Sequence, residues 1–400
     1  MRSVRLEKLL SISLVTALLF VPAPAVPAPA AEAPQQPNTL TPAELAAGWL
    51  LLFDGTSLYG WQPATKANWK VVDGTITVSG GQPGLLNTTT QFADFELQVD
   101  FQAPAATNSG VFLRTSREPR DPVRDCYELN IHSAADAPFP TGSFVGRKKS
   151  EVAAVDSAWR RFHVTAQGGK FVVQLDGRKV LEYDDPRPIG RGHIGLQLNQ
   201  GAVAFRNIKL RPLGTQLIFN GRDLAGWQIF PGKASRFDVT AAGELQVTGG
   251  PGQLETQQHY KDFILQLEVF VGAPGLNSGI FFRSLPGQFA MGYESQIQNS
   301  FLEGDRTKPK DCGTGGIYRR QNARRVAADD LTWFYKTIIA DGEHVAVWVS
   351  GILVTDFTDQ RPANANPRKG LRKEAGTIQL QGHDPTTNLR FRNLRIVELN

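Results

Sequence analysis

Apolar and polar residues alternate along many short segments of this chain, whereas helical periodicity is scarce. Phe95-Glu96-Leu97-Gln98-Val99 and Gly243-Glu244-Leu245-Gln246-Val247 are two such segments. Alternation puts apolar side chains on one face and polar ones on the other, which predicts half-buried strands. Many short strands joined by glycine-rich turns predict an antiparallel sandwich. The one helical turn that we expect starts with Thr41 as N-cap and Pro42 at the first helical position.

The strand pattern occurs twice in the chain. Asn108-Ser109-Gly110-Val111-Phe112-Leu113-Arg114 has a counterpart in Asn277-Ser278-Gly279-Ile280-Phe281-Phe282-Arg283, which starts 169 positions later (277 − 108). Each copy opens with an apolar strand, an Asp-Gly or Asn-Gly turn and a tryptophan, Trp61 or Trp227, which we expect to pack in the core. We therefore predict an all-β chain of two tandem jelly-roll-like β-sandwiches, at residues 48–213 and 214–400. Because the linker between them is short, we expect them to pack against each other.

The N-terminus has the features of a secretory signal. Basic residues precede an apolar run from Leu9 to Val21, and small residues follow around Ala23-Pro24-Ala25 and Ala28-Pro29-Ala30. We expect residues 1–30 to be a signal peptide and residues 31–47 to be a tether rich in proline and alanine. The apolar run is short for a membrane span, and an uncleaved anchor is the alternative. The mature protein is predicted to be exported, to the periplasm or outside the cell.

Composition restricts the classes of partner and cofactor. The formal charge is +5, and loss of the signal peptide lowers it to about +3, which argues against a nucleic-acid footprint. Cys126 and Cys312 are not equivalent in the two copies, so free thiols and a disulfide both stay open. The histidines have no zinc spacing, while calcium held by loop oxygens is compatible with export. No phosphate loop or dinucleotide fingerprint occurs, so no nucleotide cofactor is expected.

The strand after the repeated stretch carries candidate chemistry. In Tyr293-Glu294-Ser295-Gln296-Ile297, alternation places Glu294 and Gln296 on the same face. Arg283 ends the preceding strand. A carboxylate and an amide on one strand face, with an arginine nearby, predict the floor of a site for a polar ligand.

Several motifs occur in the same order in both copies or close the second one. They are the opening (Leu/Ile)-Phe-(Asp/Asn)-Gly-x-x-Leu-x-Gly-Trp, Asn-Ser-Gly-(Ile/Val)-Phe-x-Arg, Tyr-Glu-x-x-Ile, Thr314-Gly315-Gly316-Ile317-Tyr318, Leu380-Gln381-Gly382-His383 and Phe391-Arg392-Asn393. With these motifs the chain resembles the 3-keto-disaccharide hydrolase family, also described as 3-keto-glucoside 1,2-lyase and hydratase domains. The resemblance covers nearly the whole chain after the signal peptide and implies a concanavalin-like sandwich in each copy.

The resemblance also implies action on sugars that carry a ketone at C3. Such a ketone acidifies the hydrogen on C2, so a base can remove it, the substituent on C1 leaves by elimination, and water adds afterwards. The reaction needs a base, an acid for the leaving oxygen and donors for the enolate oxygen. It does not need the facing carboxylate pair of an ordinary glycosidase. A partner oxidoreductase would have to make the ketone.

We assign these roles in the second copy from side-chain chemistry. Glu294 would be the base, provided that burial raises its pKa. His383 would act as the acid or hold the glycosidic oxygen, and Arg283 and Gln381 would bind the enolate or sugar hydroxyls. The other expected substrate contacts are Asn277, Gln296 and Tyr318 in this copy and Asn108, Arg114 and Glu128 in the first.

Structural roles compete with these assignments. Glu294 would then pair with Arg283 across adjacent strands, His383 would be solvated in its turn, and Asn277 would stabilise the turn before its strand. In the first copy Asn199 stands where His383 does, so acid catalysis is not expected there. We therefore predict that the second domain carries the activity, and that the first binds carbohydrate, supports its neighbour or has a weakened site.

Other functions stay open at this point. A non-catalytic glycan-binding protein is the main alternative, because concanavalin-like sandwiches often bind glycans and a fold does not settle function. A pair of adhesive modules and an ordinary glycosidase that uses Asp305 or Asp311 rank lower.

Overall fold

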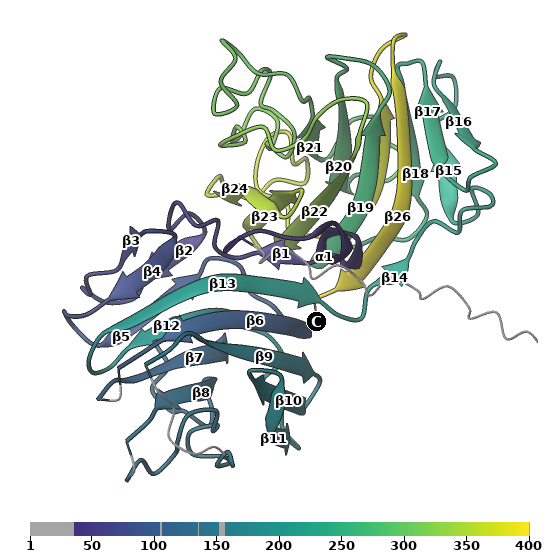
Figure 1. Cartoon of the computed structure of the whole chain (residues 1–400). Helices are drawn as coiled ribbons and strands as arrows, with labels where there is room; N and C mark the ends of the chain where they lie inside the picture. The colour runs from purple at the N-terminus through teal and green to yellow at the C-terminus, as the bar shows by residue number, and fades with distance from the viewer. Residues whose placement is uncertain (1–35, 105, 135, 152–156, 400) are drawn as a thin grey trace, which may run out of the picture. The chain divides into compact units, whose positions relative to one another are not determined.

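The computed structural model describes residues 36–104, 106–134, 136–151 and 157–399. These residues form two β-sandwiches, each built from an eight-stranded and a five-stranded sheet (Figure 1). The prediction of an all-β chain with two tandem jelly-roll sandwiches is confirmed. The predicted signal peptide, residues 1–30, and the first part of the predicted tether lie outside the described residues.

The first sandwich runs from β1 to β13 (Figure 1). Its larger sheet has the order β11-β10-β9-β6-β13-β4-β3, with β1 paired to β13; the strands are β1 (Leu50–Leu51), β3 (Lys70–Val72), β4 (Thr75–Val78), β6 (Phe95–Gln102), β9 (Arg160–Gln167), β10 (Lys170–Leu175), β11 (Arg178–Asp184) and β13 (Val203–Pro212). Its smaller sheet has the order β2-β5-β12-β7-β8, with strands β2 (Trp61–Pro63), β5 (Gly84–Thr88), β7 (Asn108–Thr115), β8 (Tyr127–His132) and β12 (His193–Leu198).

The second sandwich repeats this strand order. Its larger sheet is β16-β17-β26-β19-β22-β23-β24, with β14 paired to β26; the strands are β14 (Gln216–Leu217), β16 (Arg236–Val239), β17 (Leu245–Thr248), β19 (Phe263–Val271), β22 (Trp333–Asp341), β23 (His344–Val349), β24 (Ile352–Thr358) and β26 (Asn388–Glu398). Its smaller sheet is β15-β18-β25-β20-β21, with strands β15 (Trp227–Ile229), β18 (Gly252–Thr256), β20 (Ser278–Ser284), β21 (Tyr293–Ile297) and β25 (Thr377–Gly382). The repeat seen in the sequence is thus a repeat of complete sandwiches.

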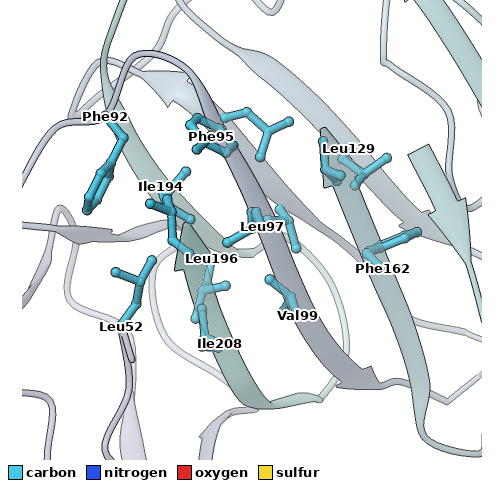
Figure 2. Packing of buried hydrophobic residues seen from close by; sticks show 14 of the residues in the cluster. Leu52, Phe92, Phe95, Leu97, Val99, Leu129, Phe162, Ile194, Leu196 and Ile208 are labelled. Carbon is cyan, nitrogen blue, oxygen red and sulfur yellow. The ribbon is translucent and has the colours of Figure 1, made fainter. Parts of the chain in front are cut away.

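The core of each sandwich lies between its two sheets. In the first, Phe95, Leu97 and Val99 of β6 meet Ile194 and Leu196 of β12, as Figure 2 shows. All five side chains are at most 1% exposed. Burial of one such side chain stabilises a fold by roughly 1.5–3 kcal/mol. The apolar residues of the alternating pattern therefore lie on the inward faces of these strands, as predicted.

The opening motif of each copy folds as predicted except at its strand. Trp61 and Trp227 are buried, and their indole nitrogens donate to the carbonyls of Leu52 (2.6 Å) and Ile218 (2.7 Å). The expected role of both tryptophans in the core is confirmed. The strand before the turn, however, ends at Leu51 in the first copy, so the segment from Leu52 onward is not part of it.

A short helix precedes the first sandwich, as the sequence predicts. Helix α1 (Pro42–Ala47) has Thr41 as its N-cap, and a capping box joins Thr41 and Glu44. The Thr41 hydroxyl accepts from the Glu44 amide, which satisfies one of the unpaired donors of the first turn. Within the described residues, no helix is long and apolar enough to cross a membrane.

Hydrogen bonds and an ion pair join the two sandwiches. The Trp348 indole donates to the Leu51 carbonyl over 2.9 Å, and the Leu51 amide donates to the Gly351 carbonyl over 2.9 Å. Arg324 pairs with Asp54 at 2.7 Å. These contacts agree with the short linker, from which we expected packing.

A lysine lies in the core of the second sandwich. Lys336 of β22 is 1% exposed, and its ammonium donates to the carbonyls of Ser295 (3.0 Å) and Gln296 (2.7 Å) on β21. Strand register gives Phe162 as its counterpart in the first sandwich. Burial lowers the pKa of Lys336 to about 7, because a charged ammonium is costly to desolvate.

This burial predicts a pH-dependent stability. The unfolded chain binds the Lys336 proton more tightly than the folded one, so the free energy of unfolding rises with pH between about 7 and the ordinary value of 10.5. The slope from this group is at most about 1.4 kcal/mol per pH unit. Denaturant unfolding of Lys336→Met across this range should lack that contribution, whereas the exposed-site control Lys369→Met should keep it. Parallel curves for all three proteins would contradict the prediction.

Candidate functional site

The smaller sheet of the second sandwich has a polar face that is nevertheless buried. Leu254, Ile280 and Leu380 point into the core, so the residues between them point the other way. That opposite face consists of Gln253, Glu255, Phe281, Glu294, Gln296, Gln379 and Gln381, all less than 9% exposed. As predicted, Glu294 and Gln296 share this face.

Glu294 lies over a glycine of the neighbouring strand. A Cβ atom on Gly279 would be 2.7 Å from Glu294 Oε1 and 2.8 Å from its Cγ, so only glycine leaves room for the carboxyl there. Glu294 is 6% exposed, and desolvation raises its pKa above the ordinary value of 4.5. In the first sandwich Glu128 lies beside Gly110 in the same way but less closely, because a Cβ on Gly110 would be at an ordinary contact distance of 3.4 Å from Glu128 Cγ.

Arg368 is the ion-pair partner of Glu294. Its Nη2 lies 3.0 Å from Glu294 Oε2, and its Nε donates to the Ala290 carbonyl over 3.0 Å. The guanidinium also lies over the rings of Phe281 and Tyr318, at 5.2 and 5.6 Å from their centroids. Its positive charge opposes the effect of burial and lowers the pKa of Glu294. The expected alternative, a pair between Glu294 and Arg283, is wrong.

Arg368 belongs to a segment that the first sandwich lacks. The Tyr293 hydroxyl donates to Asp359 (2.7 Å) and accepts from the amide of Arg372 (3.0 Å), 13 positions further along (372 − 359). The corresponding three residues in the first sandwich are Tyr127, Asp185 and Ile189. There the spacing is four positions (189 − 185), so the second copy has nine extra residues at this place.

Asn277, Gln296 and Asp311 form a hydrogen-bonded group beside Glu294. The Gln296 side-chain nitrogen donates to Asn277 Oδ1 (2.9 Å) and Asp311 Oδ2 (3.2 Å), and Asn277 donates to the same Asp311 oxygen (2.9 Å). Asp311 is thus a second carboxylate near the site, and its charge raises the pKa of Glu294. Gln296 Oε1 is buried and has no hydrogen-bond partner among the described residues.

Other amides on the sheet also have unpaired acceptors. Within the described part of the chain, Oε1 of both Gln379 and Gln381 is buried without a partner. Buried polar atoms are costly to leave unpaired, so such atoms point to a missing ligand or water. Part of the face is covered by the chain itself, since the amide of Gly287 donates to Glu255 and that of Ala290 donates to Gln253.

The loop after β21 fixes the strand that carries Glu294. The Tyr318 amide donates to the Glu294 carbonyl (2.9 Å), and the Gly315 amide donates to the Gln296 carbonyl (2.9 Å). Gly315 has a φ of +93°, and a Cβ there would lie 2.5 Å from Val354. The Thr314-to-Tyr318 motif therefore closes the sheet edge and brings the half-buried Tyr318 ring to Arg368.

His383 lies at the exposed edge of this arrangement. Its side chain is 41% exposed, and its Nδ1 lies 2.9 Å from Asp384 Oδ2. Among the described residues, no hydrogen bond joins it to Glu294, but its charge lowers the pKa of that carboxyl. His383 is thus close enough to Glu294 to affect its pKa, although no hydrogen bond joins the two side chains.

Arg283 does not lie in the site, and its predicted contact with substrate is corrected here. Its guanidinium is 1% exposed and donates to the carbonyls of Lys261 (2.7 Å), Gly342 (2.6 Å) and Arg372 (3.1 Å) and to Asp262 (2.7 Å). These bonds join loops of the two sheets. Its role is therefore structural.

Arg114 has the same structural role in the first sandwich. It donates to the carbonyls of Ala93 (2.7 Å), Gly168 (2.7 Å) and Ile189 (2.8 Å) and to Asp94 (2.9 Å). Its predicted contact with substrate is corrected for the same reason. The arginine that both copies share near the end of their repeated strand thus stabilises the sandwich.

The first sandwich has a cleft of ≈ 550 Å³ over its own smaller sheet. Glu128 and Gln197 line this cleft, and an apolar group of Leu85, Phe112 and Cys126 forms its floor. Burial raises the pKa of Glu128 to about 7, while a hydrogen bond from Gln197 opposes the shift. Asn108, the remaining predicted contact, is at the start of β7 and is not among the residues that line the cleft.

The described residues offer neither a disulfide nor a preformed metal site. Cys126 and Cys312 are both buried free thiols, and burial raises the pKa of each to about 12. Among the described residues, no group of three or more His, Cys, Asp or Glu side chains is placed to hold a metal ion. The calcium expectation stays a prediction.

Three features of the site were missed in the sequence. Arg368 was missed, although a comparison of the two copies exposes the nine extra residues that carry it. Strand β18, with Glu255, was missed because Gly252-Gln253-Leu254-Glu255-Thr256 is short. Lys336 was missed because a lysine in an alternating strand is ordinarily placed on the solvent side.

The chain matches a family model twice. The model describes a 3-keto-alpha-glucoside-1,2-lyase-like domain, and it matches residues 48–211 and 214–397. A comparison with curated proteins gives no match.

Solved structures from bacteria are similar to parts of the chain. One candidate glycosyl hydrolase from Parabacteroides distasonis ATCC 8503 is 21% identical, with a TM-score of 0.40, over 45% of this chain and 100% of that one. Another from the same organism is 27% identical, with a TM-score of 0.37, over 47% and 85%. The carbohydrate binding module CBM66 from Bacillus subtilis is 15% identical, with a TM-score of 0.31, over 38% and 95%.

The two family matches together cover most of the chain, once for each sandwich. The chain therefore belongs to the family of 3-keto-alpha-glucoside-1,2-lyase-like domains, of which it holds two copies, and it is a carbohydrate-active protein.

Proposed function

We propose that the second sandwich cleaves the glycosidic bond of 3-keto-glycosides, with Glu294 as the base that removes the proton from C2. The observation that carries the proposal is the buried carboxyl of Glu294 on a polar sheet face, beside amides whose oxygens are unpaired. A base works best when its pKa lies near the working pH, and burial raises the pKa of Glu294 in that direction.

Arg368 is the group best placed to stabilise the enolate oxygen. Its guanidinium is next to Glu294, and its remaining N–H groups are directed away from that carboxylate by the fork geometry of the side chain. A fixed positive charge near the developing oxyanion lowers the barrier without reorganisation. In our proposal Arg368 takes the role that the sequence assigned to Arg283.

The amides orient the sugar. The unpaired oxygens of Gln296 and Gln381 can accept hydrogen bonds from two sugar hydroxyls. Tyr318 and Asn277 lie beside them and would contact the ring. His383, at the exposed edge, would protonate the leaving oxygen or bind it through the imidazole.

The chemistry requires a supply of 3-keto sugar. We propose that a separate oxidoreductase in the same compartment makes the ketone, and that this protein acts after export. Addition of water to the elimination product would complete a net hydrolysis.

The first test compares a 3-keto-glucoside that has a chromogenic leaving group with the same glucoside unoxidised. Release is expected from the keto sugar alone. In a Glu128→Gln background, where the first sandwich does not contribute, Glu294→Gln should lower it by about 10²-fold or more, because the amide cannot accept the proton. Equal release from the unoxidised glucoside would contradict the proposal and favour an ordinary glycosidase that uses Asp311. A chelator in the same assay tests the calcium prediction.

The second test assigns the activity to a domain. His383→Ala should lower release of a poor leaving group from the keto sugar more than Glu128→Ala does, because only the second sandwich has an imidazole at this position. Steady-state kcat/KM for the two variants measures the difference. A larger loss from Glu128→Ala would move the main activity to the first sandwich.

The third test concerns the ion pair. The charge of Arg368 lowers the pKa of Glu294, so Arg368→Gln should raise that pKa and shift the acidic limb of the kcat/KM profile to higher pH. Lys369→Gln removes an adjacent, exposed charge and serves as the control. An unshifted acidic limb in Arg368→Gln would show that another group controls it.

A further inference from the structure

The cleft of the first sandwich contains a glutamate, Glu128, that has no ion-pair partner among the described residues. Glu128 lines the ≈ 550 Å³ cleft together with Phe112 and Gln197. Across the described residues, no lysine, arginine or histidine forms an ion pair with its carboxyl. Glu294 has Arg368 at 3.0 Å in the same position of the second sandwich. The two copies thus place the same carboxyl in different electrostatic surroundings.

The cleft lies over Glu128, whereas the chain itself covers part of the corresponding face in the second sandwich. In the second sandwich the nine-residue insertion brings Arg368 over the carboxyl, and Gly287 and Ala290 donate to side chains of the sheet. In the first, the loop between β7 and β8 lines the cleft, and its charged residues there are Arg117, Glu118 and Arg120. A ring of sugar size can therefore reach Glu128 from solvent.

The lining of the cleft suits a sugar ring. Leu85 and Phe112 line the cleft and are each 4% exposed, so they offer a small apolar contact to the C–H face of a ring. Gln197 Oε1 is buried and unpaired within the described residues, so it can accept a hydrogen bond from a hydroxyl. The cleft thus combines a small apolar contact, an unpaired acceptor and an acid–base group.

We propose that Glu128 is a second base in this chain, which removes the proton from the carbon next to the ketone of a sugar bound over Phe112. The Glu128 carboxylate takes the C2 proton, and the electrons of the C–H bond form the C2–C3 double bond of the enolate. Return of a proton from the Glu128 carboxyl to C2 restores the ketone, so no oxidant or reductant is needed. The substrate class rests on the function proposed for the second sandwich.

When the substrate has a poor leaving group, the first sandwich is expected to remove and return the C2 proton without cleavage of the glycosidic bond. Asn199 stands where the second copy has His383, and an amide cannot protonate a leaving oxygen. Reversible proton abstraction is therefore its expected activity. Burial raises the pKa of Glu128 to about 7, so its base form is populated above that pH.

Proton exchange with solvent isolates this step. A methyl 3-keto-glucoside in D₂O has a poor leaving group, and NMR follows the loss of its C2 proton signal as deuterium enters. The full-length chain with Glu294→Gln lacks the base that we propose for the second sandwich. We expect it to retain exchange that rises with pH through about 7, and we expect Glu294→Gln with Glu128→Gln to lose at least about tenfold of it.

Two further variants make the test specific. Glu182→Gln, in the Glu294→Gln background, removes an exposed carboxylate of the same sandwich that does not line the cleft, and it should leave the exchange unchanged. Glu128→Asp keeps a carboxyl group that can ionise but moves it back by one methylene. It should therefore lower the rate of exchange through the changed position alone. Thermal unfolding of each variant shows that the sandwich is intact.

The outcomes separate this proposal from the function proposed above. Exchange that is at background in Glu294→Gln, or that does not change with Glu128→Gln, would overturn the second base. Exchange that depends on Glu128 in a protein that releases no leaving group from keto-glycosides would support the second base and overturn glycosidic cleavage by the second sandwich.

Discussion

Desolvation of one carboxyl group on each smaller sheet is the constraint on which the candidate sites depend. A Cβ on Gly279 would lie 2.7 Å from Glu294 Oε1, and Glu128 lies beside Gly110, where a Cβ would be at an ordinary contact distance of 3.4 Å from its Cγ. The carboxyls of Glu128 and Glu294 therefore lie against the sheets, where water is scarce and the charged form is costly. Each sandwich thus holds an acid whose pKa is raised toward neutrality.

The two sandwiches have the same strand order, yet they place this glutamate carboxyl in different electrostatic surroundings. The shared parts are structural: the arginines Arg114 and Arg283 tie the loops of each sandwich through four hydrogen bonds. The differences are local, and they surround the carboxyl. In the second sandwich an inserted segment supplies Arg368. Divergence of the two sites thus required no change in the fold, which agrees with the identical strand orders.

The sequence predicted the fold well because alternation and repetition are local signals. The faces of β6 and β21 follow from their order of apolar and polar residues, and the copies confirm each other. Arg283 was misassigned for a physical reason: at a strand end, a positive φ of +46° turns the side chain away from the face that alternation predicts. The partner of Glu294 could not be found from pattern, since Arg368 is 74 positions away (368 − 294) in irregular structure.

The central claim is that the reaction begins with removal of the C2 proton of a 3-keto sugar by Glu294. A kinetic isotope effect tests it most directly: single-turnover release from a 3-keto-glucoside that has deuterium at C2, compared with the protium form. With a good leaving group, our account predicts slower release from the deuterated substrate, because removal of the C2 proton then limits the rate of release. Equal rates for the two substrates, with release still dependent on Glu294, would contradict it.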